Sequence, residues 1–297
     1  MAEVTAEPTL RPHRTYWRDV WTRLKRNKLA LASLCYVVLL IGTAVCAPLI
    51  QRYDPIAQSL DDSKQGPSWE HWFGTDLYGR DIYARAVHGA RIALIVGSIA
   101  TAVAICIGVL LGGIAGYFGR VVDQSIIFVY SVVATFPGLL FILALTNALP
   151  PQGEPHLSKV YLAIGLSSWV GMCRLTRNLF RSFREQEYVL AARALGASSF
   201  RIIFIHMVPN MIGFIVVAVA GGFAGAIAAE AGISFLGFGV TPPNPSWGVM
   251  ISEGRSYLQS SWWMLVFPGL STLLAVFSFN LLADGLRDAL DPRHETG

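Results

Sequence analysis

Residues 184–210 read REQEYVLAARALGASSFRIIFIHMVPN, a polar island of 27 residues between two strongly apolar segments. Each of these segments is close to the ~20 residues that span a bilayer. Good helix formers at 187–195 predict a short helix that Gly196 can end, and Ser198 or Ser199 can cap a second one. The island therefore predicts a helix-turn-helix knob on the membrane surface, a shape suited to a partner's groove.

Composition indicates an integral membrane protein. Of the 297 residues, 54% are hydrophobic and only 14% are charged, whereas soluble domains carry about 25% charged residues. The net charge of +4 comes from basic residues beside apolar segments, where anionic lipid and topology explain them better than nucleic acid does. The four cysteines lie in apolar segments without metal-like spacing, so we expect neither a disulfide nor a zinc site.

Six apolar segments predict six transmembrane helices in an all-α fold. They cover residues 29–50, 92–118, 124–149, 157–178, 207–230 and 262–283. The first segment is longer than the roughly 7–15 residues of a signal-peptide core, so we expect an uncleaved anchor. The fourth is the least apolar, because Lys159 and Arg174 bound its uncharged part.

Basic residues predict the orientation. With six spans both termini share one side, and this side, which includes the island, receives 16 of the 23 Lys and Arg residues. We therefore expect a cytoplasmic arm at 1–28 with an interfacial helix, an extracytoplasmic loop at 51–91, a membrane core at 92–285 and a cytoplasmic tail at 286–297. An outer aromatic belt is expected from Trp69, Trp72, Trp247, Trp262 and Trp263.

Glycine and proline suggest how the spans pack. Gly108, Gly112 and Gly116 recur at every fourth position and predict a flat helix face that another helix can approach closely. Pro137, followed by Gly138, breaks the hydrogen-bond ladder of the third span and predicts a kink. The small residues of the fifth span suit either close packing or a wide translocation path: Gly221, Gly222, Gly225 and Ala226.

Three residues are candidates for the path or its gate: Pro137, Glu230 and Asn280. Glu230 ends the fifth span, and an acid near the water boundary is far cheaper than one at mid-membrane. We therefore expect Glu230 at a mouth of the path. Asn280 interrupts the sixth span.

Charged residues outside the spans form two patterns. Two acid–base pairs have the i,i+4 spacing of solvated ion pairs worth a few tenths of a kcal/mol each: Asp76 with Arg80, and Asp81 with Arg85. Four arginines step along the end of the fourth span: Arg174, Arg177, Arg181 and Arg184. This stripe could grip a partner's acidic surface, although anchoring of the cytoplasmic end is the favoured interpretation.

Motifs for catalysis are missing. The chain has no GxxxxGK[ST] phosphate loop, no HExxH and no CxxC, so we expect no nucleotide, metal or catalytic site. No acid, base or histidine lies at the predicted centre of a span, which argues against a proton-coupled carrier. Energy for any transport must then come from a partner.

The island resembles the EAA loop of permease subunits in bacterial ABC importers, a pattern of Glu-Ala-Ala, three residues, Gly, nine residues, Ile, one residue and Leu-Pro. In register with this pattern are Ala191, Ala192, Gly196 and Pro209, with Val208 in place of the leucine. Leu190 replaces the glutamate and His206 the isoleucine. The runs FGTDLYGRD, GFGVTPPNPSWG and FNLLADGLRDALDP resemble the C-type subunit of the dipeptide, oligopeptide, glutathione and nickel branch.

This resemblance implies a type I importer permease with six spans in the bacterial inner membrane. Its implied partners are a homologous second permease, two ATPases that bind ATP and magnesium, and an extracytoplasmic solute-binding protein. The loop at 184–206 would couple to one ATPase through these residues: Glu187, Leu190, Ala191, Ala192, Gly196, Ala197, Ser198, Phe200, His206 and Pro209. Because Leu190 replaces an acid, we expect this contact to be more apolar than usual.

The leading interpretation is ATP-driven import of short peptides, with this chain forming half of the path. An importer of the same architecture for nickel, glutathione or another small solute is the alternative. A secondary carrier acting alone is disfavoured, because the chain shows neither inverted repeats nor buried charges.

Overall fold

The computed structural model describes residues 16–149 and 157–290, and the regular elements within these ranges are all helical. In chain order the α-helices are α1 (Tyr16–Arg26), α2 (Lys28–Val45), α3 (Ala47–Ile50), α4 (Ile82–Phe118), α5 (Arg120–Thr135), α6 (Gly138–Ala148), α7 (Leu157–Phe183), α8 (Glu187–Ala194), α9 (Ser199–Arg201), α10 (Val208–Asn210), α11 (Ile212–Phe235), α12 (Trp247–Gly254) and α13 (Trp263–Leu290). A π-helical stretch, Ile202–Met207, joins α9 to α10, and short 3₁₀ turns lie at Leu60–Asp62 and Arg255–Tyr257.

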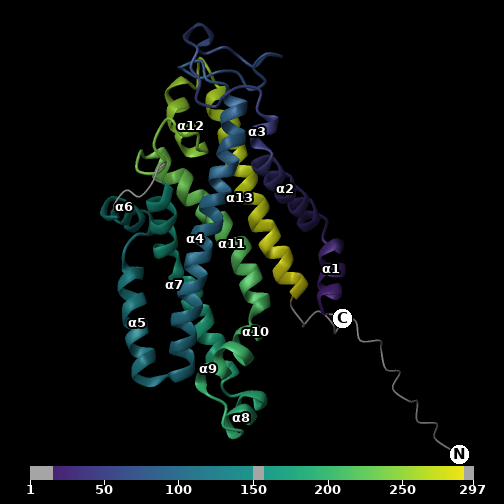
Figure 1. The fold of residues 1–297 in the computed structure, drawn as a ribbon, viewed down its shortest axis with the longest axis vertical. Helices are drawn as coiled ribbons and strands as arrows, with labels where there is room; N and C mark the ends of the chain where they lie inside the picture. Colours follow the sequence, from purple (N-terminus) through teal and green to yellow (C-terminus); the bar gives the residue numbers. More distant parts are fainter. Residues whose placement is uncertain (1–15, 150–156, 291–297) are drawn as a thin grey trace, which may run out of the picture.

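The molecule is elongated along α4, which runs through its centre (Figure 1). α7, α11 and α13 pack beside α4, while the long loop after α3 and helix α12 lie at one end. The opposite end carries α8, α9 and α10. Helix α1 and the C-terminal end of α13 lie side by side in the half of the molecule nearer to α8. With 37 residues, α4 is about 55 Å long at ~1.5 Å per residue, so it extends beyond a hydrocarbon core of ~30 Å.

Membrane-spanning capacity is clear for the long apolar helices. Within the described ranges α2, α4, α11 and α13 are long and apolar enough to cross a bilayer, and the bent pair α5 and α6 makes a fifth candidate. α7 has 27 residues, but it carries Lys159 and three arginines and is therefore less apolar than these candidates. The all-α membrane fold is confirmed, whereas the count of six spans stays a prediction.

The helix bounds in the first part of the chain differ from those of the predicted spans. α4 begins at Ile82, ten residues before the predicted start, because the Asp81 carboxylate caps it by accepting the Ala84 N–H at 2.7 Å. Part of the predicted loop 51–91 is therefore helix. The first span is interrupted at Cys46, between α2 and α3.

The bounds of α7, α11 and α13 also differ from those of the last three predicted spans, by five to seven residues at one or both ends. α7 continues to Phe183, α11 runs from Ile212 to Phe235 rather than from 207 to 230, and α13 continues to Leu290. The start of the predicted tail 286–297 is thus helical. Apolar runs show where lipid surrounds a helix, and helices continue through polar residues once they leave the lipid.

The predicted kink in the third span is a complete break. α5 ends at Thr135, α6 starts at Gly138, and the two axes differ by 95°. Pro137 lies between them as the residue before α6, where its missing N–H costs no helical hydrogen bond. The segment 124–149 is therefore either a broken span or a re-entrant turn, and Pro137 is exposed at its corner.

The glycine face of α4 packs against α7 as predicted. A methyl group at Gly108 would lie 2.6 Å from Met172 Cβ, and one at Gly116 would lie 2.6 Å from Phe180 Cβ. Such distances leave no room for any side chain, so glycine is required for this approach. The two helices pack closely along much of their length, which makes them the central pair of the fold.

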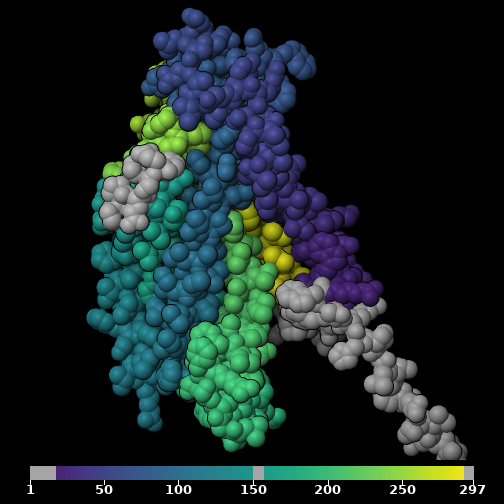
Figure 2. Space-filling view, in the orientation of Figure 1, coloured from purple at the N-terminus to yellow at the C-terminus, as the bar shows by residue number. Residues whose placement is uncertain are grey.

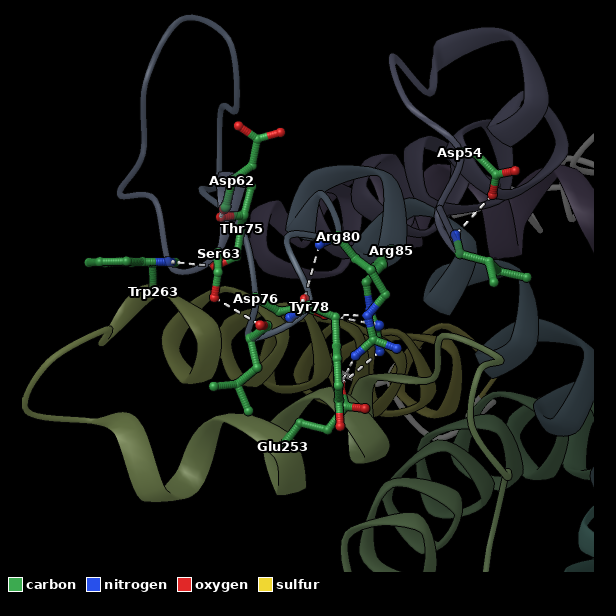
Figure 3. A network of polar contacts seen from close by, with 12 residues as sticks. Asp54, Asp62, Ser63, Thr75, Asp76, Tyr78, Arg80, Arg85, Glu253 and Trp263 are labelled. Atoms are coloured by element: carbon green, nitrogen blue, oxygen red, sulfur yellow. Dashed lines mark hydrogen bonds and ion pairs between the residues drawn. The ribbon is translucent and has the colours of Figure 1, made fainter. Parts of the chain in front are cut away.

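Charges at the end of the molecule distant from α8 form a buried network (Figure 3). The Asp76 carboxylate accepts from Arg80 Nε at 2.6 Å and from Arg85 Nη1 at 3.1 Å. Glu253 Oε2 of α12 accepts from both guanidinium groups at 2.9 Å. The side chains of Asp76, Arg80 and Arg85 are at most 5% exposed, because loop and α12 cover them.

The predicted i,i+4 pair of Asp76 with Arg80 forms but is buried and not solvated, whereas the predicted pair of Asp81 with Arg85 is wrong. Arg85 pairs with Asp76 and Glu253 instead of Asp81, and Asp81 contacts His71 Nδ1 at 2.9 Å besides capping α4. Glu253 lies 168 residues from Arg85 in the chain, so local spacing could not reveal this partner. The network ties the loop, the start of α4 and α12 into one cap.

Two of the five tryptophans predicted for an aromatic belt are structural. Trp247 is 2% exposed and donates its indole N–H to the Ala86 carbonyl at 2.9 Å. Trp263 donates to the Thr75 carbonyl at 3.1 Å. Trp69, at 92% exposed, remains free to meet an interface.

The predicted interfacial helix is α1, and one face of it is covered by protein. Val20 and Leu24 are buried in a cluster with Ala30 of α2 and Ala289 of α13. Its basic residues Arg18, Arg23, Lys25 and Arg26 alternate with this buried stripe. α1 thus packs on the end of α13 in addition to any contact with lipid headgroups.

Substitution Gly112→Leu tests the α4–α7 contact. A carbon added at Gly112 would lie 2.8 Å from Thr176 Cβ, so we expect a loss of about 3 kcal/mol or more in stability. Gly42→Leu is the control, since a carbon added there meets no described atom within 4 Å. Thermal unfolding in detergent measures both, and equal midpoints for the two variants would contradict the packing role.

Substitution Glu253→Gln tests the cap network. It leaves two buried guanidinium groups facing one carboxylate, and we expect about 3 kcal/mol of destabilisation. The double variant Arg85→Met/Glu253→Gln removes one charge of each sign and should recover part of that loss. Glu70→Gln, at an exposed position in the same loop, is the control. Arg85→Met is also measured alone. If the effects of Arg85→Met and Glu253→Gln on the unfolding midpoint add up to that of the double variant, the coupling is refuted.

Candidate functional site

The knob predicted at 184–210 is present and stands on a buried apolar base. Val189, Met207 and Met211 are fully buried in a cluster that also contains Phe180 of α7 and Tyr117 of α4. These anchors come from both arms of the loop, so α7, α4 and the knob share one packed cluster. The knob is thereby held rigidly against the membrane helices, and it projects at the lower end in Figure 2.

A glycine turn ends the first short helix as predicted. Gly196 has φ +77°, its N–H bonds the Arg193 carbonyl, and the Ala197 N–H bonds the Ala192 carbonyl, each at 3.0 Å. These two bonds are the signature of a Schellman C-cap, which requires a residue in the left-handed region. Ala192 and Ala197 also pack together against the buried base. The turn direction between the two short helices therefore depends on Gly196.

The second short helix is capped by Ser198, one of the two predicted candidates. The Ser198 hydroxyl accepts the Arg201 N–H at 3.3 Å, and the chain then continues as the π-helical stretch to Met207. Pro209 lies in α10, after which α11 begins at Ile212. Pro209 thus lies within the predicted fifth span 207–230 but before α11.

Large apolar side chains cover the outer surface of the knob. Leu195 is 88% exposed and Phe200 is 70% exposed, and the Phe200 and Phe204 rings lie 4.5 Å apart. Other exposed apolar residues on the knob are Tyr188, Leu190 and Ile205. Apolar patches of this kind on a protein surface indicate a protein–protein contact. We call the exposed apolar residues of the knob the knob surface; they are Tyr188, Leu190, Leu195, Phe200, Phe204 and Ile205.

Most predicted coupling residues lie where a partner could reach them. Exposed on the knob are Glu187, Leu190, Ala191, Gly196, Ser198, Phe200 and Pro209, whereas Ala192, Ala197 and His206 are half-buried. Sequence reasoning omitted Tyr188, Leu195, Phe204 and Ile205 from the coupling set. Their signal was a surplus of large apolar residues in a loop expected to face water. Whether each residue touches a partner stays a prediction.

The arginine stripe is engaged within the chain at three of its four positions. Arg177 forms an ion pair with Asp123 of α5, the Arg184 guanidinium donates to the Tyr117 carbonyl, and Arg174 lies 4.9 Å from the Tyr130 ring centroid. Arg193 of α8 also lies over the Tyr117 ring. These contacts hold α7 to α4 and α5, and anchoring of the cytoplasmic end by the arginines stays a prediction.

Two of the three path candidates have their polar groups occupied within the fold. Glu230 is 1% exposed inside α11, and its carboxylate accepts from the Ser234 hydroxyl at 2.6 Å. Ser234 in turn accepts the Val240 N–H at 3.0 Å, so Glu230 ties α11 to the chain leading to α12. Glu230 is therefore buried within this chain, and its position at a mouth of the path stays a prediction. Asn280 is exposed on α13 and donates to the Val276 carbonyl of its own helix.

Fold and surface together define a class: a multi-pass helical membrane protein that exposes apolar side chains on a packed knob. Residues 108–296 match the model of the binding-protein-dependent transport system inner membrane component. Residues 15–67 match the N-terminal transmembrane domain of oligopeptide transport permease C. The chain therefore belongs to the family of inner-membrane components of binding-protein-dependent transport systems.

Curated relatives extend this similarity over nearly the whole chain. It is 42% identical to the dipeptide transport system permease DppC of Alkalihalophilus pseudofirmus, over 93% of this chain and 90% of that protein. Identity is 38% to the oligopeptide transport system permease OppC of Bacillus subtilis, over 97% and 93% of the two chains. The glutathione transport system permease GsiD of Pectobacterium atrosepticum is 37% identical, over 94% and 92%. Proteins of this family are the non-catalytic membrane components of bacterial ABC transporters.

Substitution Gly196→Val tests the turn. A β-branched residue in the left-handed region should cost about 1–2 kcal/mol, and amide hydrogens of α8 should exchange faster. Gly196→Asn should be milder, because asparagine tolerates this region. Gly269→Val is the control at a helical glycine with open space around it. Wild-type protection of α8 in Gly196→Val would contradict the role of the turn.

Proposed function

We propose that this chain is the permease subunit of an ATP-driven importer and forms half of the path for short peptides. The knob surface carries the proposal, because a rigid, water-facing apolar patch needs a partner to cover it. The names of the dipeptide and oligopeptide permeases at 38–42% identity support the peptide substrate. Glutathione, a peptide-like solute in the name of a 37% identical relative, is the second candidate.

The proposed assembly contains a homologous second permease, two ATPases and an extracytoplasmic solute-binding protein. ATP and magnesium are bound by the ATPases in this proposal, and the chain itself binds neither. The knob sits in a groove on one ATPase, where Leu190 makes the contact more apolar than an acid would. When the ATPases close, the groove carries the knob with it. Since the knob shares a packed base with α7 and α4, this motion reaches the membrane helices.

The proposed topology in the bacterial inner membrane has both termini and the knob in the cytoplasm. The excess of basic residues on this side supports it, and α1 and the end of α13 lie in the same half of the molecule as α8 in Figure 1. α12 and the cap then face outward, where a solute-binding protein would arrive. A carrier acting alone would leave the knob surface without a function.

Substitution Leu195→Asp or Phe200→Asp tests the docking role. Both side chains are at least 70% exposed, so we expect no loss of stability. Each change places a charge in an apolar contact and should weaken ATPase binding at least tenfold, by analogy with interface hot spots. Copurification of the ATPases with the permease pair measures this effect.

The control is Leu60→Asp, an equally apolar position, 74% exposed, in the loop at the opposite end. It should retain both ATPases. Full ATPase binding by Leu195→Asp and Phe200→Asp would overturn the docking role. Peptide uptake into vesicles driven by an ion gradient, without ATP and ATPases, would instead favour a secondary carrier.

A further inference from the structure

A cavity of about 210 Å³ lies where α4, α7 and α11 meet near the middle of each helix. The helices line it mainly with small side chains, among them Ala100, Ala104, Ala218, Gly222 and Ala226. The described lining contains no charged residue, and its polar side chains are Thr101 and Ser168. Small residues alone would indicate close packing, so the hydroxyl groups decide what this space can do.

The Thr101 hydroxyl has an unmet hydrogen-bonding capacity. Thr101 is 4% exposed, and its Oγ1 has no hydrogen-bond partner among the described residues. Thr176 of α7 also has no hydrogen-bond partner among the described residues, but it packs in the α4–α7 contact beside Gly112 and does not line the cavity. A buried hydroxyl without a partner is destabilising, so its presence at a cavity points to a ligand that supplies the partner.

Glycines keep the cavity open on two sides. A methyl group at Gly222 would lie 2.6 Å from Thr101 Cγ2, so any side chain there would crowd the hydroxyl. Gly171, one turn along α7 from Ser168, is exposed, and a carbon added there would meet no described atom within 4 Å. The bare backbone at these positions lets a ligand approach closely.

The cavity lies between the two helices that carry the knob. α7 leads into residues 184–210 and α11 leads out of them, while α4 lines the third side of the cavity. A knob displaced by a partner would move the end of α7 against the start of α11. The width of the cavity would then follow the state of the docked partner.

We propose that this cavity is a subsite of the translocation path that takes one small, uncharged side chain of the transported peptide. It is smaller than the ~300–1,000 Å³ pockets that hold whole drug-sized ligands, so it takes one side chain and not the entire peptide. Thr101 and Ser168 hydrogen-bond the peptide group next to this side chain. A charged side chain is excluded, because the lining offers no counter-charge. The inference rests on the proposed peptide import.

Substitution Gly171→Leu tests the space. Leucine fills the open side of the cavity, and we expect uptake of leucylleucine to fall at least tenfold relative to uptake of glycylglycine. The complete importer in proteoliposomes, with its binding protein and ATP, is used for both peptides, and each rate is taken at saturation of the binding protein. Gly269→Leu on α13, where space is also open, is the control and should keep the wild-type ratio.

Substitution Thr101→Val tests the hydroxyl while keeping the shape. Since the hydroxyl has no partner within the described chain, valine should not lower the unfolding midpoint. Uptake of both peptides should fall about three- to tenfold, and Thr101→Ser should restore it. A lower midpoint with unchanged uptake would show that the hydroxyl serves the fold and not the peptide.

The outcomes separate the subsite from the function on which it rests. A wild-type importer that moves neither peptide overturns peptide import itself. A wild-type importer that moves both, together with an unchanged ratio in Gly171→Leu, overturns the subsite and leaves peptide import standing. An equal fall for the two peptides in Gly171→Leu also overturns it, because a blocked path would not distinguish side chains.

Discussion

Close packing of α4 against α7 is the contact on which the rest of the molecule depends. Gly108, Gly112 and Gly116 let the α7 backbone approach, and α7 brings Phe180 into the base of the knob. Farther along the same pair, Thr101 and Gly171 border the cavity beside α11. Lipid offers little hydrophobic drive for helices to associate, so backbone proximity and van der Waals contact must supply it. The pair α4 and α7 thus supports the knob surface and also borders the cavity.

The two ends of the molecule solve opposite problems. At the end with α12, four charged side chains neutralise one another in a cover of loop and helix, which makes a rigid cap. At the other end, Leu195 and Phe200 are left exposed on a base that is fully packed. A charged network that is satisfied internally needs no further partner, whereas an exposed apolar patch on a rigid support does. This contrast is the basis for proposing the knob as the docking site.

Short-range patterns predicted the features that depend on neighbouring residues. The Schellman turn at Gly196, the Ser198 cap and the glycine face of α4 follow from residues within a few positions of one another. Helix ends were less predictable, because Asp81 starts α4 and residues up to Leu290 extend α13 outside the apolar runs. Hydropathy indicates which residues lie in the bilayer, whereas backbone and capping hydrogen bonds determine where a helix begins and ends.

Contacts between distant residues account for what the chain order concealed. Arg85 has a potential partner four residues earlier, yet its charge is met by Glu253 of α12. Glu230 looked like the end of a span, but α11 continues and buries it beside Ser234. Membrane class, the knob and its turn were thus readable from local composition and spacing, because they depend on residues close in the chain. The cap network, the burial of Glu230 and the Thr101 cavity arose only when helices met, because each needs groups that lie far apart in sequence.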